Sequence, residues 1–186
     1  SGKTNLETIG DVKLSTTVTK YGNSSMYFDG TGDNVTARNT IPIGSGNFTV
    51  EFWVYPLSNS NTSFPGMFDC RNAGADTNGF GLYYNGGSTF VLRIGGDNFA
   101  SSQTVALNQW SHVALCRVGT TMTCYINGIS RISTTSSADF NRTVHYVGST
   151  FDNYGLQGYI QDVRITRGVA RYTTNFTPLT STFPTK

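Results

Sequence analysis

The hydrophobic residues of this chain occur in short alternating runs that predict β-strands. The clearest run spans residues 48–55, where two sets of side chains alternate: Phe48, Val50, Phe52 and Val54 against Thr49, Glu51, Trp53 and Tyr55. Successive side chains of a strand point to opposite faces, so one face of this strand is apolar and the other carries an acid and two large aromatic residues. No segment shows the sustained period of an amphipathic helix.

Comparable runs recur along the chain, separated by Gly, Asn, Asp and Ser. The turn Asn85-Gly86-Gly87 is a strong hairpin signal between two of them. The other runs that we expect to form strands lie at residues 112–118, 122–126, 129–132, 144–147 and 159–166. Many short strands with regular turns predict an all-β fold, an antiparallel β-sandwich of the jelly-roll type with two curved sheets.

The length of 186 residues predicts one domain with a sizeable core. Residues 1–20 are less patterned, and we expect them to form a lead-in and one edge strand. Residues 21–186 are expected to form a single sandwich domain. Four long polar segments, at 57–79, 95–109, 133–142 and 149–157, are predicted to be loops, which carry function on rigid β scaffolds.

The composition indicates which kinds of ligand or partner suit this chain. Charged residues make up only 13% of the chain, and Ser, Thr, Asn and 21 Gly provide much of its polarity. A surface of neutral hydrogen-bonding groups suits neutral sugars better than ionic ligands. The net charge of +2 and the absence of a dense Lys/Arg run argue against nucleic acid. No apolar stretch has the ~20 residues that span a bilayer, so we expect no membrane insertion, and the first residues do not resemble a signal peptide.

Cys70, Cys116 and Cys124 are an odd number of cysteines, which argues against a disulfide scaffold. Cys116 and Cys124 flank a turn around Gly119, and a three-residue loop there places them opposite each other. We favour two unbonded, small hydrophobic residues over a disulfide, because the geometry of a β-ladder rarely allows one.

Several motifs carry a resemblance to a known family. They are SMYFDGTGD at 25–33, FTVEFWVYP at 48–56, WSHVAL at 110–115, YING at 125–128, GYIQDVRITRGVARY at 158–172 and NFTP at 175–178. In this order they resemble the laminin-G-like, concanavalin A-like lectin/glucanase superfamily over about residues 20–184. This version looks most like modules of phage tail fibres and bacterial surface proteins. The resemblance implies a virion or cell-surface location and a larger, homo-oligomeric fibre.

Some relatives of this fold hydrolyse glycans, a reaction that needs two carboxylates across the scissile bond. The chain has only two glutamates, Glu7 and Glu51, far apart in sequence. We interpret Glu51 as a partly buried structural acid tied to a neighbouring Arg or to the backbone, and His112 as a hydrogen-bonded sheet residue. Nothing local supports a nucleophile pair between Cys70 and a histidine. The sequence therefore predicts that the domain is not an enzyme.

The turn Asp29-Gly30-Thr31-Gly32-Asp33 offers two carboxylates and free carbonyls, which are the hard oxygen ligands that Ca²⁺ prefers. In many relatives this turn lies near the strand that carries Asp162, so the resemblance makes Asp162 a third candidate ligand. Gln161 stands where the family often has an acid, which lowers the available charge. The alternative is that Asp29 and Asp33 only cap a β-turn.

Three loop groups combine acids or amides with an aromatic residue or Arg, the mixture that neutral sugars need. The candidate ligand residues are Asp69, Arg71, Asn72 and Asp76, then Asp97, Asn98 and Phe99, and finally Asp152, Asn153 and Tyr154. Their convergence at one rim is taken from the resemblance. The predicted function is a non-catalytic carbohydrate-recognition or adhesion module that binds host glycans. One alternative is a structural domain of a fibre without a sugar ligand, and a weaker one is a divergent glycan-degrading enzyme.

Overall fold

The computed structural model describes residues 4–85 and 89–184, and every regular element in them is a β-strand. The strands are β1 (Asn5–Ile9), β2 (Lys13–Ser15), β3 (Ser25–Asp29), β4 (Asn34–Arg38), β5 (Phe48–Ser58), β6 (Gly66–Asp69), β7 (Phe80–Asn85), β8 (Thr89–Ile94), β9 (Asp97–Ala100), β10 (Ser111–Val118), β11 (Thr121–Ile126), β12 (Ile129–Thr135), β13 (His145–Val147) and β14 (Gln157–Arg167). Among these residues, no helix has the length and apolar character needed to cross a membrane.

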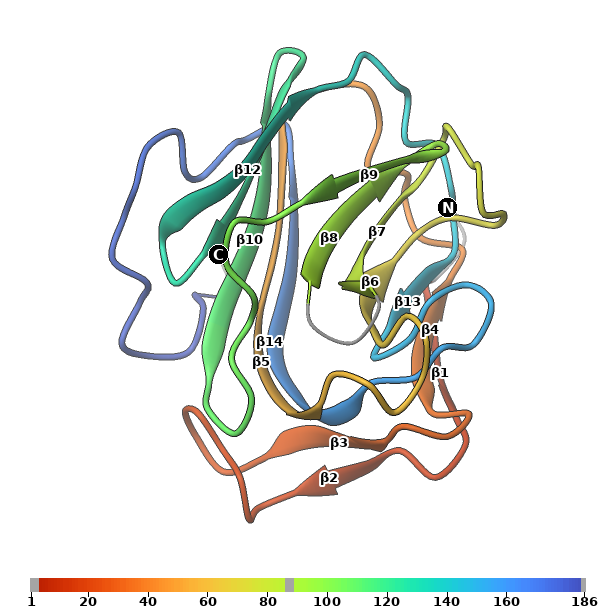
Figure 1. Ribbon diagram of the computed structural model, residues 1–186, viewed down its shortest axis with the longest axis vertical. Coiled ribbons are helices and arrows are strands. Elements are labelled where there is room, and N and C mark those ends of the chain that lie inside the picture. Colours follow the sequence, from red (N-terminus) through yellow and green to blue (C-terminus); the bar gives the residue numbers. More distant parts are fainter. Residues whose placement is uncertain (1–3, 86–88, 185–186) are drawn as a thin grey trace.

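The strands form two antiparallel sheets that pack face to face (Figure 1). Sheet A has the order β1-β4-β13-β6-β7-β8-β9, and sheet B has the order β12-β11-β10-β5-β14-β3-β2. The predicted all-β sandwich is confirmed. Strand β7 pairs with β8, which confirms the predicted hairpin around the turn that begins at Asn85. The turn residues 86–88 lie outside the described residues.

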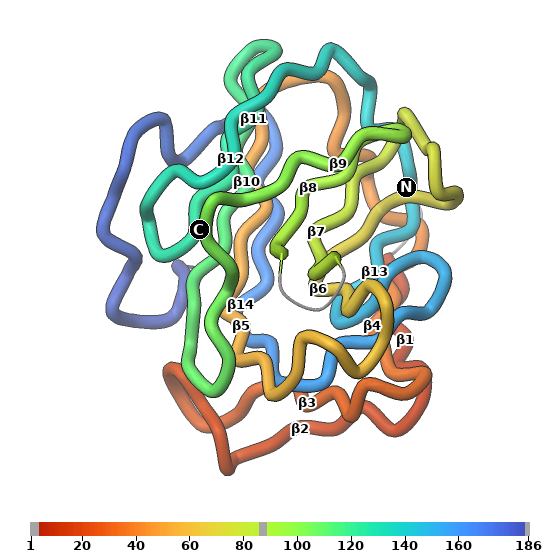
Figure 2. The backbone as a smooth tube through the Cα atoms, viewed as in Figure 1, coloured from red at the N-terminus to blue at the C-terminus, as the bar shows by residue number. Residues whose placement is uncertain are grey.

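Strand β5 lies at the centre of sheet B, between β10 and β14. Its apolar face enters the core as predicted, since Phe48, Val50 and Phe52 are each at most 1% exposed. Thr49 and Glu51 of the opposite face are buried as well, because Arg171 and Tyr172 of the segment 168–184 bond to them. Tyr172 and Phe176 of this segment stack with ring centroids 3.5 Å apart. Figure 2 traces the segment in dark blue beside the β10–β12 side of the molecule.

All four segments that we expected to be loops contain strand residues, although in 149–157 only the last residue, Gln157, belongs to a strand. Strand β6 lies within 57–79, β9 lies within 95–109, and β12 extends to Thr135 inside 133–142. Strand β6 is short, and all four of its residues are buried, so it lacks the alternation of a half-exposed strand. Strand β9 is an exposed edge strand of four residues whose polar composition resembles that of a loop.

The N-terminal residues form two edge strands where one was expected. Strand β1 pairs with β4 in sheet A, whereas β2 pairs with β3 in sheet B. All five residues of β1 are exposed, so its side chains carry no burial signal. Backbone pairing with β4 holds this strand in place.

The prediction that Cys116 and Cys124 face each other was wrong. The turn between β10 and β11 has only two residues, and Cys116 pairs with Thr123 while Cys124 pairs with Leu115. This one-residue offset sends the two side chains to opposite faces of the sheet. Cys124 enters the core and Cys116 lies under the C-terminal segment, and both are free thiols, as is Cys70.

Candidate functional site

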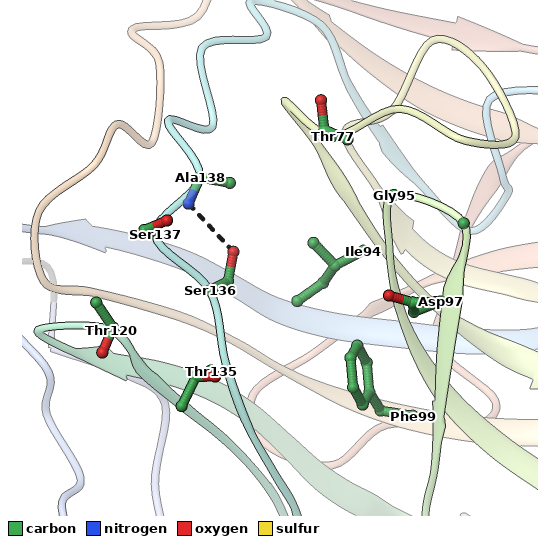
Figure 3. A pocket seen from close by; sticks show the side chains of 11 residues that line it. Thr77, Ile94, Gly95, Asp97, Phe99, Thr120, Thr135, Ser136, Ser137 and Ala138 are labelled. Atoms are coloured by element: carbon green, nitrogen blue, oxygen red, sulfur yellow. Dashed lines mark hydrogen bonds between the residues drawn. The ribbon is translucent and has the colours of Figure 1, made fainter.

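A groove of about 650 Å³ lies where the edges of the two sheets approach each other. Strand β9 is the last strand of sheet A, β12 is the last strand of sheet B, and the two are in contact. We call this hollow the edge groove (Figure 3). It is lined by Thr77, Ile94, Gly95, Gly96, Asp97, Phe99, Thr120, Thr135, Ser136, Ser137 and Ala138.

The lining of the edge groove combines an apolar surface with hydroxyl groups and one carboxylate. Figure 3 shows Ile94, Asp97 and Phe99 across the groove from Thr135 and Ser136. Asp97 is exposed, and within the described ranges its carboxylate makes no hydrogen bond to another protein group. An aromatic ring can pack on the C–H groups of a polyol while neighbouring hydroxyl and carboxylate oxygens accept hydrogen bonds from it.

Buried Arg117 fixes one wall of the edge groove. Its guanidinium donates to the backbone carbonyl of Ala138 at 2.7 Å, to that of Gly119 at 3.0 Å and to that of Ser45. The backbone N–H of Ser136 donates to the carbonyl of Thr120 at 2.8 Å. These bonds hold the hydroxyl-bearing wall before any ligand arrives, which reduces the entropy cost of binding.

Asp76 supports the opposite wall and is not itself exposed, contrary to our expectation of a ligand residue on a loop surface. Its side chain is 5% exposed and forms an ion pair with Arg142 at 2.7 Å. It also accepts the backbone N–H groups of Asn72 and Asn78 at 2.8 and 2.9 Å. Burial alone raises the pKa of Asp76, but these hydrogen bonds outweigh it and hold the pKa below its usual value. Asp76 therefore positions Thr77.

A smaller hollow of about 200 Å³, the face groove, lies on the outer face of sheet A. It contains two of the predicted residues, Arg71 and Asp152, beside Phe64, Tyr83, Arg93 and Phe151. Arg71 is only 4% exposed, and its guanidinium lies 5.4 Å from the ring of Tyr83 and 5.1 Å from that of Phe151. Asp69, predicted as an exposed ligand residue, is fully buried and binds Arg71 at 2.6 Å. Because its guanidinium is paired and packed in this way, Arg71 stabilises the fold.

Of the remaining predicted residues, Asn98 and Tyr154 contact side chains of the face groove, whereas Asn72 and Asn153 line neither groove. Asn98 faces the side of the face groove, because it accepts hydrogen bonds from Tyr83 at 2.9 Å and Arg93 at 3.1 Å. Asn153 is an exposed turn residue with a φ of 69°. Tyr154 packs edge-on against Phe64 with centroids 5.2 Å apart. Asn72 is exposed and contributes its backbone to the Asp76 contact.

Two of the candidate ligand residues named from the sequence, Asp97 and Phe99, line the edge groove, but the hydroxyl wall opposite them was not predicted. Thr135, Ser136 and Ser137 belong to a run of five hydroxyl residues at positions 133–137. That run was visible in the sequence, within a segment already assigned to a loop. The pairing of the edges of β9 and β12 in space was not visible, because the two strands belong to different sheets.

Asp11, Asp29 and Asp33 form an acidic cluster, with one oxygen of each within 4.8 Å of the others. Asp162 is elsewhere: it accepts the N–H of Phe183 at 3.2 Å, so its proposed place as third ligand is taken by Asp11. Asp33 is fully buried and accepts the N–H groups of Asp11 and Asp29, each at 2.9 Å. Each carboxylate oxygen has a second lone pair, so the cluster retains acceptors that fit a hard cation.

A family model described as the concanavalin A-like lectin/glucanases superfamily matches residues 29–170. The chain belongs to this superfamily. No curated protein sequence matches the chain. Among solved structures, Domain 4 of AbnA, a GH43 extracellular arabinanase from Geobacillus stearothermophilus in complex with arabinotriose, has a TM-score of 0.67 at 17% identity, covering 91% of this chain and 84% of that one.

Two further structures share the fold of this superfamily member. The botulinum neurotoxin serotype D binding domain has a TM-score of 0.60 at 18% identity, covering 87% of this chain and 43% of that chain. Domains LG4-5 of the mouse laminin alpha1 chain have a TM-score of 0.58 at 12% identity, covering 87% of this chain and 47% of that chain. At these identities the likeness establishes the fold alone.

The superfamily includes both lectins and glucanases, so the state of Glu51 bears on the function. Its carboxylate lies on the outer face of β5 and is fully buried, where the sequence interpretation expected partial burial beside an arginine. It accepts hydrogen bonds from Arg164 at 2.9 Å and from Tyr172 at 2.8 Å, and contacts His112 at 3.2 Å. Burial alone raises the pKa of Glu51, but the bonds with His112, Tyr172 and Arg164 hold it below its usual value.

Proposed function

We propose that this domain is a non-catalytic carbohydrate-recognition module and that its ligand site is the edge groove. The observation that carries the proposal is the row of hydroxyl side chains that faces Phe99 across the groove, together with the exposed carboxylate of Asp97. The volume of about 650 Å³ lies in the range of small-ligand sites. The arabinanase domain that resembles this fold was solved with arabinotriose, which supports a sugar as the ligand class.

The acids and thiols support a binding role over catalysis. A glycosidase needs an accessible acid with a partner carboxylate, whereas Glu51 is sealed beneath Tyr172 by three hydrogen-bonding partners. Burial raises the pKa of the Cys70, Cys116 and Cys124 thiols, which disfavours the nucleophilic thiolate. Glu51 acts as the structural centre of sheet B's outer face.

The setting of this module is part of the proposal. We place it in a phage tail fibre or another surface fibre, where it binds glycans of a host cell and functions outside the cell or on a virion. Extracellular and surface proteins among the similar folds, including laminin and the extracellular arabinanase, support this placement. A neutral, Ser/Thr/Asn-rich surface is suited to the hydroxyl groups of such glycans.

A glycan array followed by calorimetry tests the site with two matched variants. Asp97→Asn and Asp152→Asn each remove one exposed negative charge, the first from the edge groove and the second from the face groove. We expect Asp97→Asn to weaken binding at least about tenfold, because a hydrogen bond to a charged group contributes about 1.5–3 kcal/mol. Asp152→Asn should leave the affinity unchanged.

Three outcomes count against the proposal. The reverse pattern, with loss only in Asp152→Asn, moves the ligand to the face groove. An array without any binding glycan favours a structural domain of a fibre. Hydrolysis of an array glycan identifies an enzyme.

We also propose that the cluster of Asp11, Asp29 and Asp33 binds Ca²⁺ in the weak range typical of extracellular modules, about 10⁻⁴–10⁻³ M. Gly10 supports the fit of this cluster, because a Cβ at that position lies 2.1 Å from the Asp33 carboxylate. Two backbone N–H groups fix Asp33, while Asp29 and Asp11 lie nearer the solvent and are positioned to close around a cation.

A further inference from the structure

An apolar hollow of about 420 Å³ opens between the sheets at the end opposite the edge groove. Strands β1, β4 and β13 line it from sheet A, and β3 and β14 line it from sheet B. We call it the apolar hollow. Its inner wall is formed by Met26, Val35, Phe68, Val147, Val163 and Ile165.

The hollow exists because one edge of β14 has no partner strand along its second half. Strand β3 pairs with β14 only over residues 157–160, whereas β5 pairs with it up to Arg167. Val163 and Ile165 are therefore left half-buried beside the core. At the mouth, Leu6 is 74% exposed and Ile41 is 66% exposed. Apolar surface of this kind gains free energy when a ligand removes it from water.

The polar groups of the hollow have one sign of charge. Among the residues that the structure describes, Arg167 is the only charged side chain in the lining; it is exposed, and its guanidinium has no ion-pair partner within them. His145 also lines the hollow and is 2% exposed. No carboxylate lies in the lining. An apolar wall with a lone guanidinium at its rim complements an apolar chain that ends in an anion.

We propose that the apolar hollow binds a single-chain anionic amphiphile, a medium-chain alkyl carboxylate, with its chain along the inner wall and its carboxylate at Arg167. The volume lies within the range of small-ligand sites. The site is separate from the edge groove and does not depend on the proposed carbohydrate function.

Calorimetric titration below the micellar concentration tests this proposal with decanoate, hexanoate and decyltrimethylammonium. Burial of each methylene contributes about 0.8 kcal/mol, or about fourfold in affinity, so hexanoate, which is four methylenes shorter, should bind about 200-fold more weakly than decanoate. Decyltrimethylammonium has the same chain with a cationic head, and we expect it to bind more weakly than decanoate.

Three variants locate the ligand. Ala37→Phe places a ring in the hollow and should abolish decanoate binding, with retained folding checked by the melting temperature. Arg167→Gln should weaken binding about three- to fivefold, in line with a solvent-exposed ion pair. Lys13→Gln, which removes the same charge from outside the hollow, should leave the affinity unchanged.

The proposal is overturned if decanoate shows no saturable binding, or if the cationic amphiphile binds as tightly as the carboxylate. Unchanged binding by a folded Ala37→Phe variant also overturns it. Sedimentation of the ligand-free protein adds a further outcome: a dimer that Ala37→Phe dissociates shows that a second copy of the chain occupies the hollow instead.

Discussion

Replacement of Glu51 by glutamine tests the claim that this acid is structural. The carboxylate is fully buried and receives hydrogen bonds or ionic contacts from four groups. Arg164 approaches one oxygen at 2.8 Å and Arg171 the same oxygen at 3.8 Å, while Tyr172 and His112 approach the other. Glu51→Gln keeps the shape but removes the charge, and one oxygen becomes an NH₂ group that meets donors.

The expected loss is about 3 kcal/mol in the free energy of unfolding, at the lower end of the cost of breaking a buried ion pair, because the amide keeps one acceptor. For a domain of this size that corresponds to a fall of roughly 6–12 °C in the melting temperature. The lowered pKa of Glu51 also determines in which direction the free energy of unfolding changes with pH. Its contribution is present above the usual glutamate pKa and is lost as the pH falls through the lower pKa of the folded protein.

Urea unfolding followed by tryptophan fluorescence measures this loss, since Trp53 is a buried neighbour on the same face of β5, 5.2 Å from the His112 ring. Glu7→Gln is the matched control. Glu7 forms an exposed pair with Arg38 at 2.9 Å, so its replacement should cost at most about 1 kcal/mol. Equal stabilities for the two variants refute the reasoning, and so does a polysaccharide hydrolase activity that only Glu51→Gln removes.

Three further changes probe other parts of the structure. Millimolar Ca²⁺ should raise the melting temperature of the parent and of Asp162→Asn but not that of Asp29→Asn, because of these two residues only Asp29 belongs to the acidic cluster. A parent protein whose melting temperature changes with neither Ca²⁺ nor a chelator contradicts the site. Burial lowers the pKa of His145 to about 4, so the free energy of unfolding should fall by about 2 kcal/mol between pH 7 and pH 5 as the unfolded chain takes up a proton. Urea titrations of His145→Gln at both pH values test this, and a free energy of unfolding that depends on pH as in the parent rules it out. Gly10→Ala should destabilise by at least about 1 kcal/mol, since Gly10 has a φ of +77° and its new Cβ meets Asp33; a thermal melt identical to the parent's argues against that contact.

The strands whose side chains alternate were predictable, and β5 shows why. Phe48, Val50 and Phe52 enter a core whose period the sequence displays directly. Strands β1 and β6 lack this signal for opposite reasons, because β1 is wholly exposed and β6 is wholly buried. Their positions come from backbone pairing, which leaves no pattern in the side chains.

The candidate site was predictable only in part, because burial at a loop position depends on distant residues. Asp69 ends strand β6 and Asp76 lies in the loop that follows it, yet Asp69 is buried against Arg71 and Asp76 against Arg142. Asp97 has no such partner and stays exposed in the edge groove. The difference depends on which segments meet in space, since Arg142 is 66 positions from Asp76.

The central claim is that a carbohydrate binds in the edge groove. NMR chemical-shift mapping with the best glycan from the array tests it most directly. Titration should shift the backbone amides of Thr77, Gly96, Asp97 and Ser137, which lie on both walls of the groove. Shifts confined to the face groove around Thr150, Phe151 and Asp152, or no residue-specific shifts at saturating glycan, contradict it.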